Sequence, residues 1–253
     1  MPAPIHVAAL YRYPVKGFSP EPLDSIVLAV GETVPHDRAY AIENGPSGFD
    51  PAAPSYFPKA RFLMLMRNER MAEFRTRFDP QTGEFFIERD GALAVSASLE
   101  TEEGRARLEN WLAENFAAEL RGAPRILSAP GHSFSDKPDK VIHLVNLASV
   151  RALEEEFGAA IDPLRFRPNI LIDGAEPFAE LEWPGRDVRI GGVGLTGEER
   201  TVRCAATNVD PETGRRDMQI PRGLMQRYGH SDFGIYLKVT AAGALRIGDA
   251  LLA

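Results

Sequence analysis

The sequence has almost no cysteine: Cys204 is the only one in 253 residues. A lone thiol excludes an internal disulfide, a zinc site built from several cysteines and a self-contained iron–sulfur cluster, because each needs more than one sulfur ligand. Any special chemistry of Cys204 must therefore be solitary: a nucleophile, a persulfide carrier, or one thiolate on a metal held mainly by other groups. The simplest alternative is a small buried apolar side chain.

Long apolar runs and an excess of positive charge are also absent. No run approaches the roughly 18 apolar residues that cross a bilayer, and residues 1–6 lack the basic and apolar regions of a signal peptide. We therefore expect a cytoplasmic protein with no membrane span. The net charge of -7 disfavours nucleic acid as a partner, although a local basic cluster could still bind a smaller anion.

Signatures of nucleotide and histidine–metal sites are missing as well. The glycines of residues 191–194 do not join a strand to a helix, as a dinucleotide fingerprint requires, and no Gly-Lys-Ser/Thr phosphate loop occurs. The five histidines are dispersed, without metal-ligand spacing. A hydrolase that pairs Cys204 with His143 or His230 stays open, but no local signature supports it.

Short strand-like runs separated by turn signals dominate the chain, which favours antiparallel β-structure. The runs are residues 7–13, 25–30, 38–43, 62–66, 72–78, 84–89, 93–97, 169–172, 187–195, 201–209, 235–239 and 245–252. Residues 101–118 and 146–157 have apolar residues at helical spacing, the second followed by Gly158 as a C-terminal cap.

A polar stretch rich in Pro and Gly, residues 129–139, is the predicted boundary between two domains. We predict a mixed α/β chain that is predominantly β. Residues 1–128 form an N-terminal β-rich domain, and residues 129–253 form a small β-barrel domain with a few helices.

Two segments of the first half combine residues that fix the backbone with a cationic side chain. Residues 13–17 end a strand, where Pro and Gly shape the chain and Lys16 supplies a point charge. In residues 36–40, strand alternation predicts that Arg38 and Tyr40 share one face. The alternatives are a solvated lysine for Lys16 and a buried ion pair for Arg38.

Two further segments lie in the second half. If residues 165–170 are extended, as Pro168 favours, Arg167 and Asn169 share a face with Arg165 that suits a planar, oxygen-rich or phosphorylated ligand; a structural ladder of arginines is the alternative. The other segment surrounds Cys204, whose neighbour Arg203 could favour the thiolate. It ends in a β-turn signature that begins at Asp210.

Together the four segments resemble the MOSC superfamily, in the two-part arrangement of the mitochondrial amidoxime-reducing component and its bacterial relatives. The resemblance spans nearly the whole chain. Residues 13–17 and 37–38 look like the N-terminal MOSC domain, whereas residues 166–170 and 203–214 look like the MOSC barrel.

The resemblance implies that the chain binds the molybdenum cofactor (Mo-molybdopterin), with Cys204 as the protein ligand of the metal. The residues that it implies for cofactor binding, or for lining the site near the metal, are Lys16, Arg38, Arg167, Asn169, Arg203, Thr207 and Asn208, with Asp210 as a candidate for proton delivery or for shaping the turn. The implied activity is oxygen-atom transfer from an N-hydroxylated or related N–O or S–O small molecule.

One cysteine cannot hold a plant-type iron–sulfur cluster, so the electrons are expected from a separate ferredoxin-, flavodoxin- or cytochrome b5-type donor protein. Two alternatives stay open: a sulfur carrier with a persulfide on Cys204, and a cofactor-binding module without turnover. The chain also departs from its relatives. Gly17 stands where some pair the lysine with serine, Asn208 stands where threonine is common, and the first cysteine of a Cys-Ser-Arg-Cys tetrad is absent.

Overall fold

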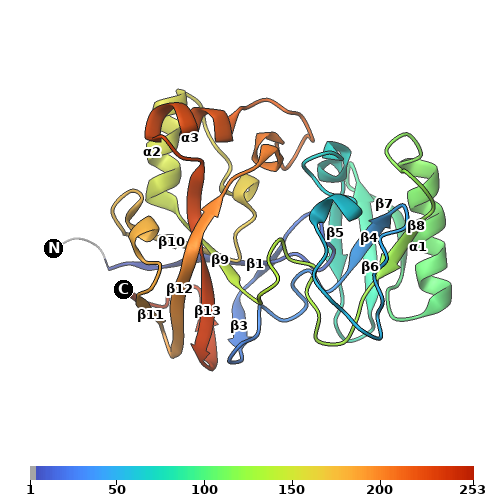
Figure 1. Cartoon of the computed structure of the whole chain (residues 1–253), viewed down its shortest axis with the longest axis horizontal. Helices are drawn as coiled ribbons and strands as arrows, with labels where there is room; N and C mark the ends of the chain where they lie inside the picture. Colours follow the sequence, from blue (N-terminus) through green and yellow to red (C-terminus); the bar gives the residue numbers. More distant parts are fainter. Residues whose placement is uncertain (1–3) are drawn as a thin grey trace.

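The computed structural model describes residues 4–253 and confirms a mixed α/β chain in which strands dominate. The elements form two groups that lie side by side (Figure 1). One group contains most strands of the C-terminal half with helices α2 and α3, and the other contains the strands between residues 41 and 127 with helix α1. None of the helices within residues 4–253 is both long and apolar enough to cross a membrane.

An eight-stranded sheet is the frame of the first group. Its order is β15-β11-β12-β13-β9-β10-β1-β2, in which β9 and β10 are parallel and the other neighbours antiparallel. The strands are β1 (His6–Arg12), β2 (Glu21–Leu23), β9 (Ile142–Asn146), β10 (Ile170–Asp173), β11 (Asp187–Ile190), β12 (Val193–Val202), β13 (Asp232–Ala241) and β15 (Leu251–Leu252).

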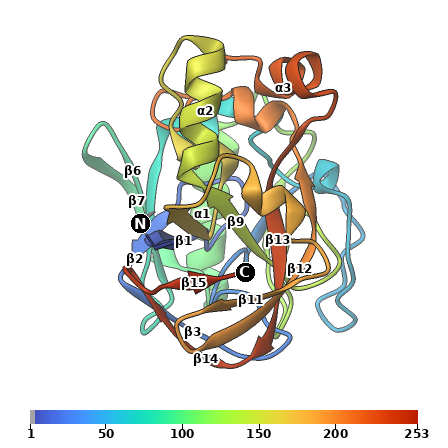
Figure 2. The ribbon, with the colours of Figure 1, turned by 90° about the vertical axis from the view of Figure 1, so that its left-hand side faces the viewer.

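This sheet is not a closed barrel, because β15 and β2 remain its edges. An isolated bridge between His6 and Ala250 nevertheless links β1 to the end of the chain, so the sheet curves back toward its own edge. A separate pair, β3 (Ser25–Leu28) with β14 (Gly243–Arg246), lies at the bottom of the same group (Figure 2).

Two helices, α2 and α3, cover one face of the central strands. Every residue of β9 is buried, since its neighbours flank it on both sides and α2 (Leu147–Phe157) packs over β9 and β10 (Figure 2). Asn146 caps the start of α2, and Gly158, the predicted C-terminal cap, ends it in the left-handed conformation. Helix α3 (Ile220–Tyr228) was not predicted; it buries Ile220 and Leu224 in the same apolar cluster.

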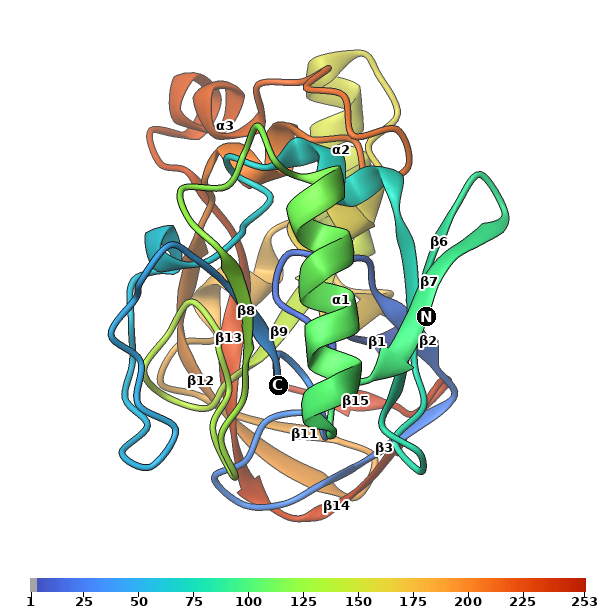
Figure 3. The ribbon, with the colours of Figure 1, turned by 90° about the vertical axis from the view of Figure 1, so that its right-hand side faces the viewer.

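Helix α1 (Glu102–Asn115) completes the second group by packing beside β7 and β8 (Figure 3). The Thr101 hydroxyl accepts a hydrogen bond from the Gly104 N–H and so caps the helix. The apolar stripe that predicted this helix is buried at Leu108 and Leu112. The strands of this group are β4 (Ala41–Asn44), β5 (Arg75–Phe78), β6 (Glu84–Arg89), β7 (Ala92–Ser98) and β8 (Pro124–Leu127).

Several predicted strands are wrong in part: residues 72 and 73 belong to a 3-10 helix, and residues 187–195 and 245–252 each span parts of two strands. Residues 36–39 form a turn before β4, and residues 63–66 are irregular or in a turn. Strand β12 ends at Val202, and Ala205–Asn208 form a short 3-10 helix, η5, directly after Cys204. At Arg38 a tertiary contact replaces strand pairing, because the Arg38 N–H donates to the Tyr13 carbonyl from a left-handed backbone (φ 50°).

The N-terminal strands do not stay within the first half of the chain. β1 pairs with β10, and β3 pairs with β14, so both strands belong to the sheets of the C-terminal half. The division at residues 128 and 129 stays a prediction. The polar stretch of residues 129–139 runs between β8 and β9, where it contributes to the pocket described next.

Candidate functional site

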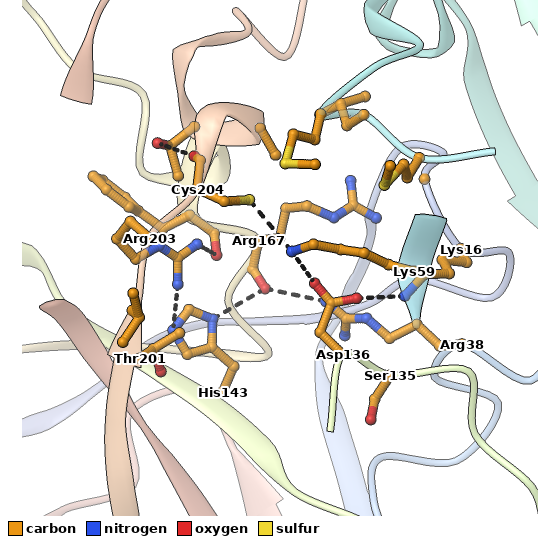
Figure 4. Close-up of a pocket in the computed structure, with 18 of the residues that line it drawn as sticks. Lys16, Arg38, Lys59, Ser135, Asp136, His143, Arg167, Thr201, Arg203 and Cys204 are labelled. Atoms are coloured by element: carbon orange, nitrogen blue, oxygen red, sulfur yellow. Dashed lines mark hydrogen bonds and ion pairs between the residues drawn. The ribbon is translucent and has the colours of Figure 1, made fainter. Parts of the chain in front are cut away.

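A pocket brings together seven of the nine site residues proposed from the sequence (Figure 4). They come from the end of β1, the turn before β4, the segment between α2 and β10, and the end of β12. The seven are Lys16, Arg38, Arg167, Asn169, Arg203, Cys204 and Thr207. Asn208 and Asp210 are not among the lining residues.

Cys204 lies at the point where β12 gives way to η5, and its side chain is half-buried in the pocket. The buried Thr207 fixes this turn, because both its backbone N–H and its hydroxyl donate to the Cys204 carbonyl, at 3.1 and 3.0 Å. The hydrogen bonds to the Cys204 carbonyl therefore fix the backbone of this residue, while its Sγ faces the pocket (Figure 4).

A chain of charges leads from the thiol across the pocket. Lys59 Nζ lies 3.4 Å from Cys204 Sγ and 2.9 Å from Asp136 Oδ2, and the other carboxylate oxygen of Asp136 lies 2.5 Å from Lys16 Nζ (Figure 4). Partial desolvation in the pocket opposes the charge on the Asp136 side chain, but the two ammonium groups outweigh it and hold the pKa of the carboxyl well below its ordinary value.

Neither Lys59 nor Asp136 was predicted from the sequence as a site residue. Lys59 lies in a proline-rich segment between β4 and β5 that carries no signature, and Asp136 lies in the stretch that was interpreted as a linker. Burial opposes the charge on Lys59 too, yet Asp136 and the Cys204 thiol raise its pKa above the ordinary value. Lys16 is more deeply buried, and burial lowers its pKa despite the pair with Asp136.

Arg38 and Arg167 lie against the same aromatic ring. Their guanidinium carbons are 4.5 and 4.2 Å from the centre of the Tyr13 ring, within the range of cation–π contacts. Neither residue is in an extended strand as predicted: both have a left-handed backbone, with φ of 50° and 54°. Arg167 ends a short 3-10 helix, η3 (Pro163–Phe166), so the predicted common face with Arg165 does not form.

The two guanidinium groups differ in how their charge is balanced. Arg38 Nη1 pairs with the buried Asp37 carboxylate at 2.5 Å. Within residues 4–253 Arg167 forms no ion pair, its Nη2 has no hydrogen-bond partner, and burial lowers its pKa to about 10. A buried charged nitrogen without a partner is costly, so Nη2 of the half-buried Arg167 marks a position suited to an anionic ligand.

Arg203 does not lie against the thiol, although it precedes Cys204. Its Nη2 donates to the Phe166 carbonyl at 2.7 Å and its Nη1 lies 3.2 Å from His143 Nε2. His143 Nδ1 faces the Arg167 carbonyl at 3.3 Å, so Nδ1 carries the hydrogen and Nε2 accepts from Arg203. Burial, reinforced by Arg203, lowers the pKa of His143 well below its ordinary value and keeps the ring neutral.

Asn169 holds the backbone of the site together. Its amide donates to Asp37 Oδ1 at 3.0 Å and to the Tyr11 carbonyl at 3.2 Å, while its oxygen accepts from the His143 N–H. All of these atoms are protein atoms. In this geometry Asn169 positions Asp37 and β9 instead of presenting a free amide to a ligand.

Asn208 and Asp210 lie behind the pocket in the turn that precedes α3. Asp210 Oδ1 accepts the N–H groups of Glu212 and Thr213, and Oδ2 lies 3.0 Å from Arg165 Nη2. Asn208 Oδ1 accepts the first N–H of α3, from Ile220. Both side chains therefore shape the turn, and the use of Asp210 in proton delivery remains a prediction.

The donor atoms of the pocket indicate which kind of group it can hold. No cluster of three or more His, Cys, Asp or Glu side chains occurs in the part of the chain that the structure describes, so Cys204 has no metal-ligating companions there. A single soft thiol beside several cations, with buried nitrogens of Arg167 and Arg203 left without partners, fits an anionic ligand that brings most of a metal's ligands itself.

Comparison with known families identifies the C-terminal half. Residues 131–252 match the family model for the MOSC domain, a range that contains Asp136, Arg167, Arg203 and Cys204. The match ends one residue before the chain does.

Curated relatives agree with this match over part of the chain. The mitochondrial amidoxime reducing component 2 of Rattus norvegicus is 33% identical over 120 residues, which are 43% of this chain and 35% of that protein. The molybdenum cofactor sulfurase of Drosophila melanogaster is 32% identical over 142 residues, which are 52% of this chain and 17% of the fly protein. The aligned part is therefore about a third of the rat protein and less of the fly protein.

Among solved structures, the YuaD protein of Bacillus subtilis aligns with 99% of this chain and 96% of its own length, at 12% identity and a TM-score of 0.46. The YiiM protein of Geobacillus stearothermophilus aligns with 44% of this chain and 52% of its own, at 17% identity and a TM-score of 0.36.

Proposed function

The chain is a MOSC-domain protein, and on this basis we propose that it binds the molybdenum cofactor in the pocket around Cys204 and uses it as a reductase. The substrates we propose are N-hydroxylated or related N–O and S–O small molecules. The observation that carries the proposal is a solitary, half-buried thiol in a cationic pocket that contains Arg167, whose buried Nη2 has no hydrogen-bond partner and which forms no ion pair within residues 4–253.

Each residue of the pocket has a distinct part in this proposal. Cys204 supplies the one protein thiolate to the metal. Arg167 and Arg38, together with Lys16, attract and orient the anionic part of the cofactor, since charged donors form the strongest hydrogen bonds to phosphate. His143 and Asn169 fix the backbone that carries these cations.

When bound, the cofactor supplies the two-electron oxygen-atom-transfer chemistry, and the protein supplies binding, orientation and electrostatics. With one cysteine in the sequence, an iron–sulfur cluster held by this chain is excluded. We therefore expect electrons from a separate donor protein of the ferredoxin, flavodoxin or cytochrome b5 type.

The test is metal, pterin and mass analysis of the protein made in a host that synthesises the cofactor, followed by assays with a chemical electron donor. Stoichiometric molybdenum and pterin, with reduction of amidoximes, hydroxylamines or sulfoxides, is the expected result. Cofactor without turnover indicates a binding module. Absence of molybdenum together with the mass of one added sulfur on Cys204 indicates a persulfide carrier, and either result contradicts the reductase.

A further inference from the structure

The charged side chains that line the pocket do not balance. Two are carboxylates, Asp37 and Asp136, and the rest are cations: Lys16, Arg38, Lys59, Arg165, Arg167 and Arg203. Arg165 is neutralised from behind by Asp210 and Asp217, at 3.0 and 2.8 Å. Even so, the pocket retains more positive than negative charge and can accept an anion with more than one negative charge.

The two carboxylates are held very differently. Asp37 accepts hydrogen bonds from the Tyr13 N–H, from Asn169 and from Arg38, and its side chain is 2% exposed. Asp136 is 41% exposed, and among residues 4–253 its carboxylate forms hydrogen bonds and ion pairs with Lys16 and Lys59 only. The Asp37 side chain is therefore fixed by hydrogen bonds within the protein, whereas the Asp136 side chain can move out of the pocket by giving up only its two lysine partners.

The position between the two lysines suits an anion whether or not Asp136 fills it. The side chain of Lys16 is 8% exposed, and an isolated buried ammonium is costly. Its other partner is the neutral Phe134 carbonyl at 2.8 Å, which belongs to the same stretch as Asp136. Lys59 likewise reaches Asp136 from a different part of the chain (Figure 4).

We propose that Asp136 is a specificity-determining residue, because its carboxylate occupies the anion position between Lys16 and Lys59 and a ligand enters that position only by displacing it. A monoanion exchanges one negative charge for another and gains little. A dianion, such as a phosphate group, adds negative charge to a pocket with a positive excess. Asp136 thus selects dianionic oxyanions over monoanions.

The test uses the full chain without molybdenum and two probes, inorganic phosphate at pH 8 and nitrate, with binding measured by isothermal titration calorimetry. The wild type is expected to bind phosphate at least about tenfold more tightly than nitrate. Asp136→Asn leaves both lysines without a competing carboxylate. This variant is expected to bind nitrate about tenfold or more tightly than the wild type does. The ratio of the nitrate Kd to the phosphate Kd is therefore expected to fall.

Two further variants link the effect to this position. Asp139→Asn removes a carboxylate of the same stretch that pairs with Lys238 on the surface, and it is expected to change neither affinity. Lys59→Met added to Asp136→Asn is expected to abolish the gain in nitrate binding. If Asp136→Asn does not fold, Asp136→Ser is measured in the same way.

Unchanged or weaker nitrate binding by the folded Asp136 variant overturns the inference, because Asp136 would then arrange the lysines instead of competing with ligands. The experiment needs neither cofactor nor turnover. A protein without molybdenum could still bind nitrate more tightly after Asp136→Asn. A molybdenum reductase could fail to show this gain in nitrate affinity. The inference and the proposed function are therefore tested separately.

Discussion

Lys59 Nζ lies 3.4 Å from Cys204 Sγ, although 145 positions separate the two residues in the sequence. The contact brings an ammonium group from the segment between β4 and β5 to the thiol at the end of β12. Asp136 holds Lys59 in place from a third segment. The environment of the thiol is therefore assembled by the fold, and the cation next to it in sequence, Arg203, is directed elsewhere.

Replacing Cys204 by serine tests the proposed metal ligand. We expect Cys204→Ser to change the molybdenum spectrum and abolish reductase activity, because a hydroxyl is a harder and more weakly ionised ligand than a thiol. The free energy of unfolding should change by less than about 1 kcal/mol, since the side chain is half-buried and Lys59 keeps Asp136 as a partner. Full activity with an unchanged molybdenum spectrum contradicts the assignment.

Arg167 and Arg165 can be compared directly, because both line the pocket but, within residues 4–253, Arg165 has counter-ions and Arg167 has none. Arg167→Met is expected to leave the free energy of unfolding unchanged or higher, since it removes an uncompensated buried charge, while cofactor occupancy falls severalfold. Arg165→Met is expected to lower stability by about 2 kcal/mol, because it leaves Asp210 and Asp217 without their partner. Urea denaturation and molybdenum content provide the two measurements.

The opposite pattern contradicts this interpretation. If Arg167→Met lost stability as Arg165→Met does and still bound the cofactor normally, Arg167 would be a structural residue of the Tyr13 stack.

Gly17 has a backbone that a serine tolerates poorly. Its φ is +91°, and a Cβ there would lie 2.7 Å from the Cε atom of the buried Met71. Gly17→Ser is therefore expected to lower the free energy of unfolding by about 2 kcal/mol. Gly131→Ser is the control, because Gly131 also has a positive φ but has open space around it, and about 1 kcal/mol is expected there. Equal losses for the two variants would show that contact with Met71 has no effect.

The Glu180 carboxyl, which lies away from the pocket, is expected to make the free energy of unfolding depend on pH. Burial raises the pKa of this carboxyl to about 6, against hydrogen bonds from Ser149 and Asn146, and it has no cationic partner within residues 4–253. The folded state therefore binds the proton more readily than the unfolded state, so the Glu180 contribution to stability falls as the pH rises from about 4.5 to 6. The total change is about 2 kcal/mol.

Glu180→Gln removes this titration. The difference in unfolding free energy between variant and wild type, from urea denaturation at pH 4.5 to 7.5, should shift by about 2 kcal/mol in favour of the variant. His143 titrates in the opposite direction in both proteins and cancels in the difference. If the difference in unfolding free energy between Glu180→Gln and the wild type did not change with pH, the prediction would be contradicted.

Regular elements with a local signature could be predicted from the sequence. Helices α1 and α2 follow from their apolar stripes and from Thr101, Asn146 and Gly158, since capping depends on residues within one turn of the helix end. Helix α3 was missed because its nine residues include Pro221 and Gly223, which lower helix propensity, and no side chain caps its start. It is stabilised by burial in the cluster it shares with α2.

Within the pocket, the sequence alone indicated which types of chemical group are present. The set of nine site residues came from the resemblance to the MOSC superfamily, and seven of the nine line one pocket. The tertiary structure alone decided which cation reaches the thiol, which arginine has no counter-ion and which carboxylate lies between the lysines. These outcomes depend on segments more than 100 positions apart and on left-handed backbones at Arg38 and Arg167, and neither local propensity nor side-chain alternation encodes contacts over that separation.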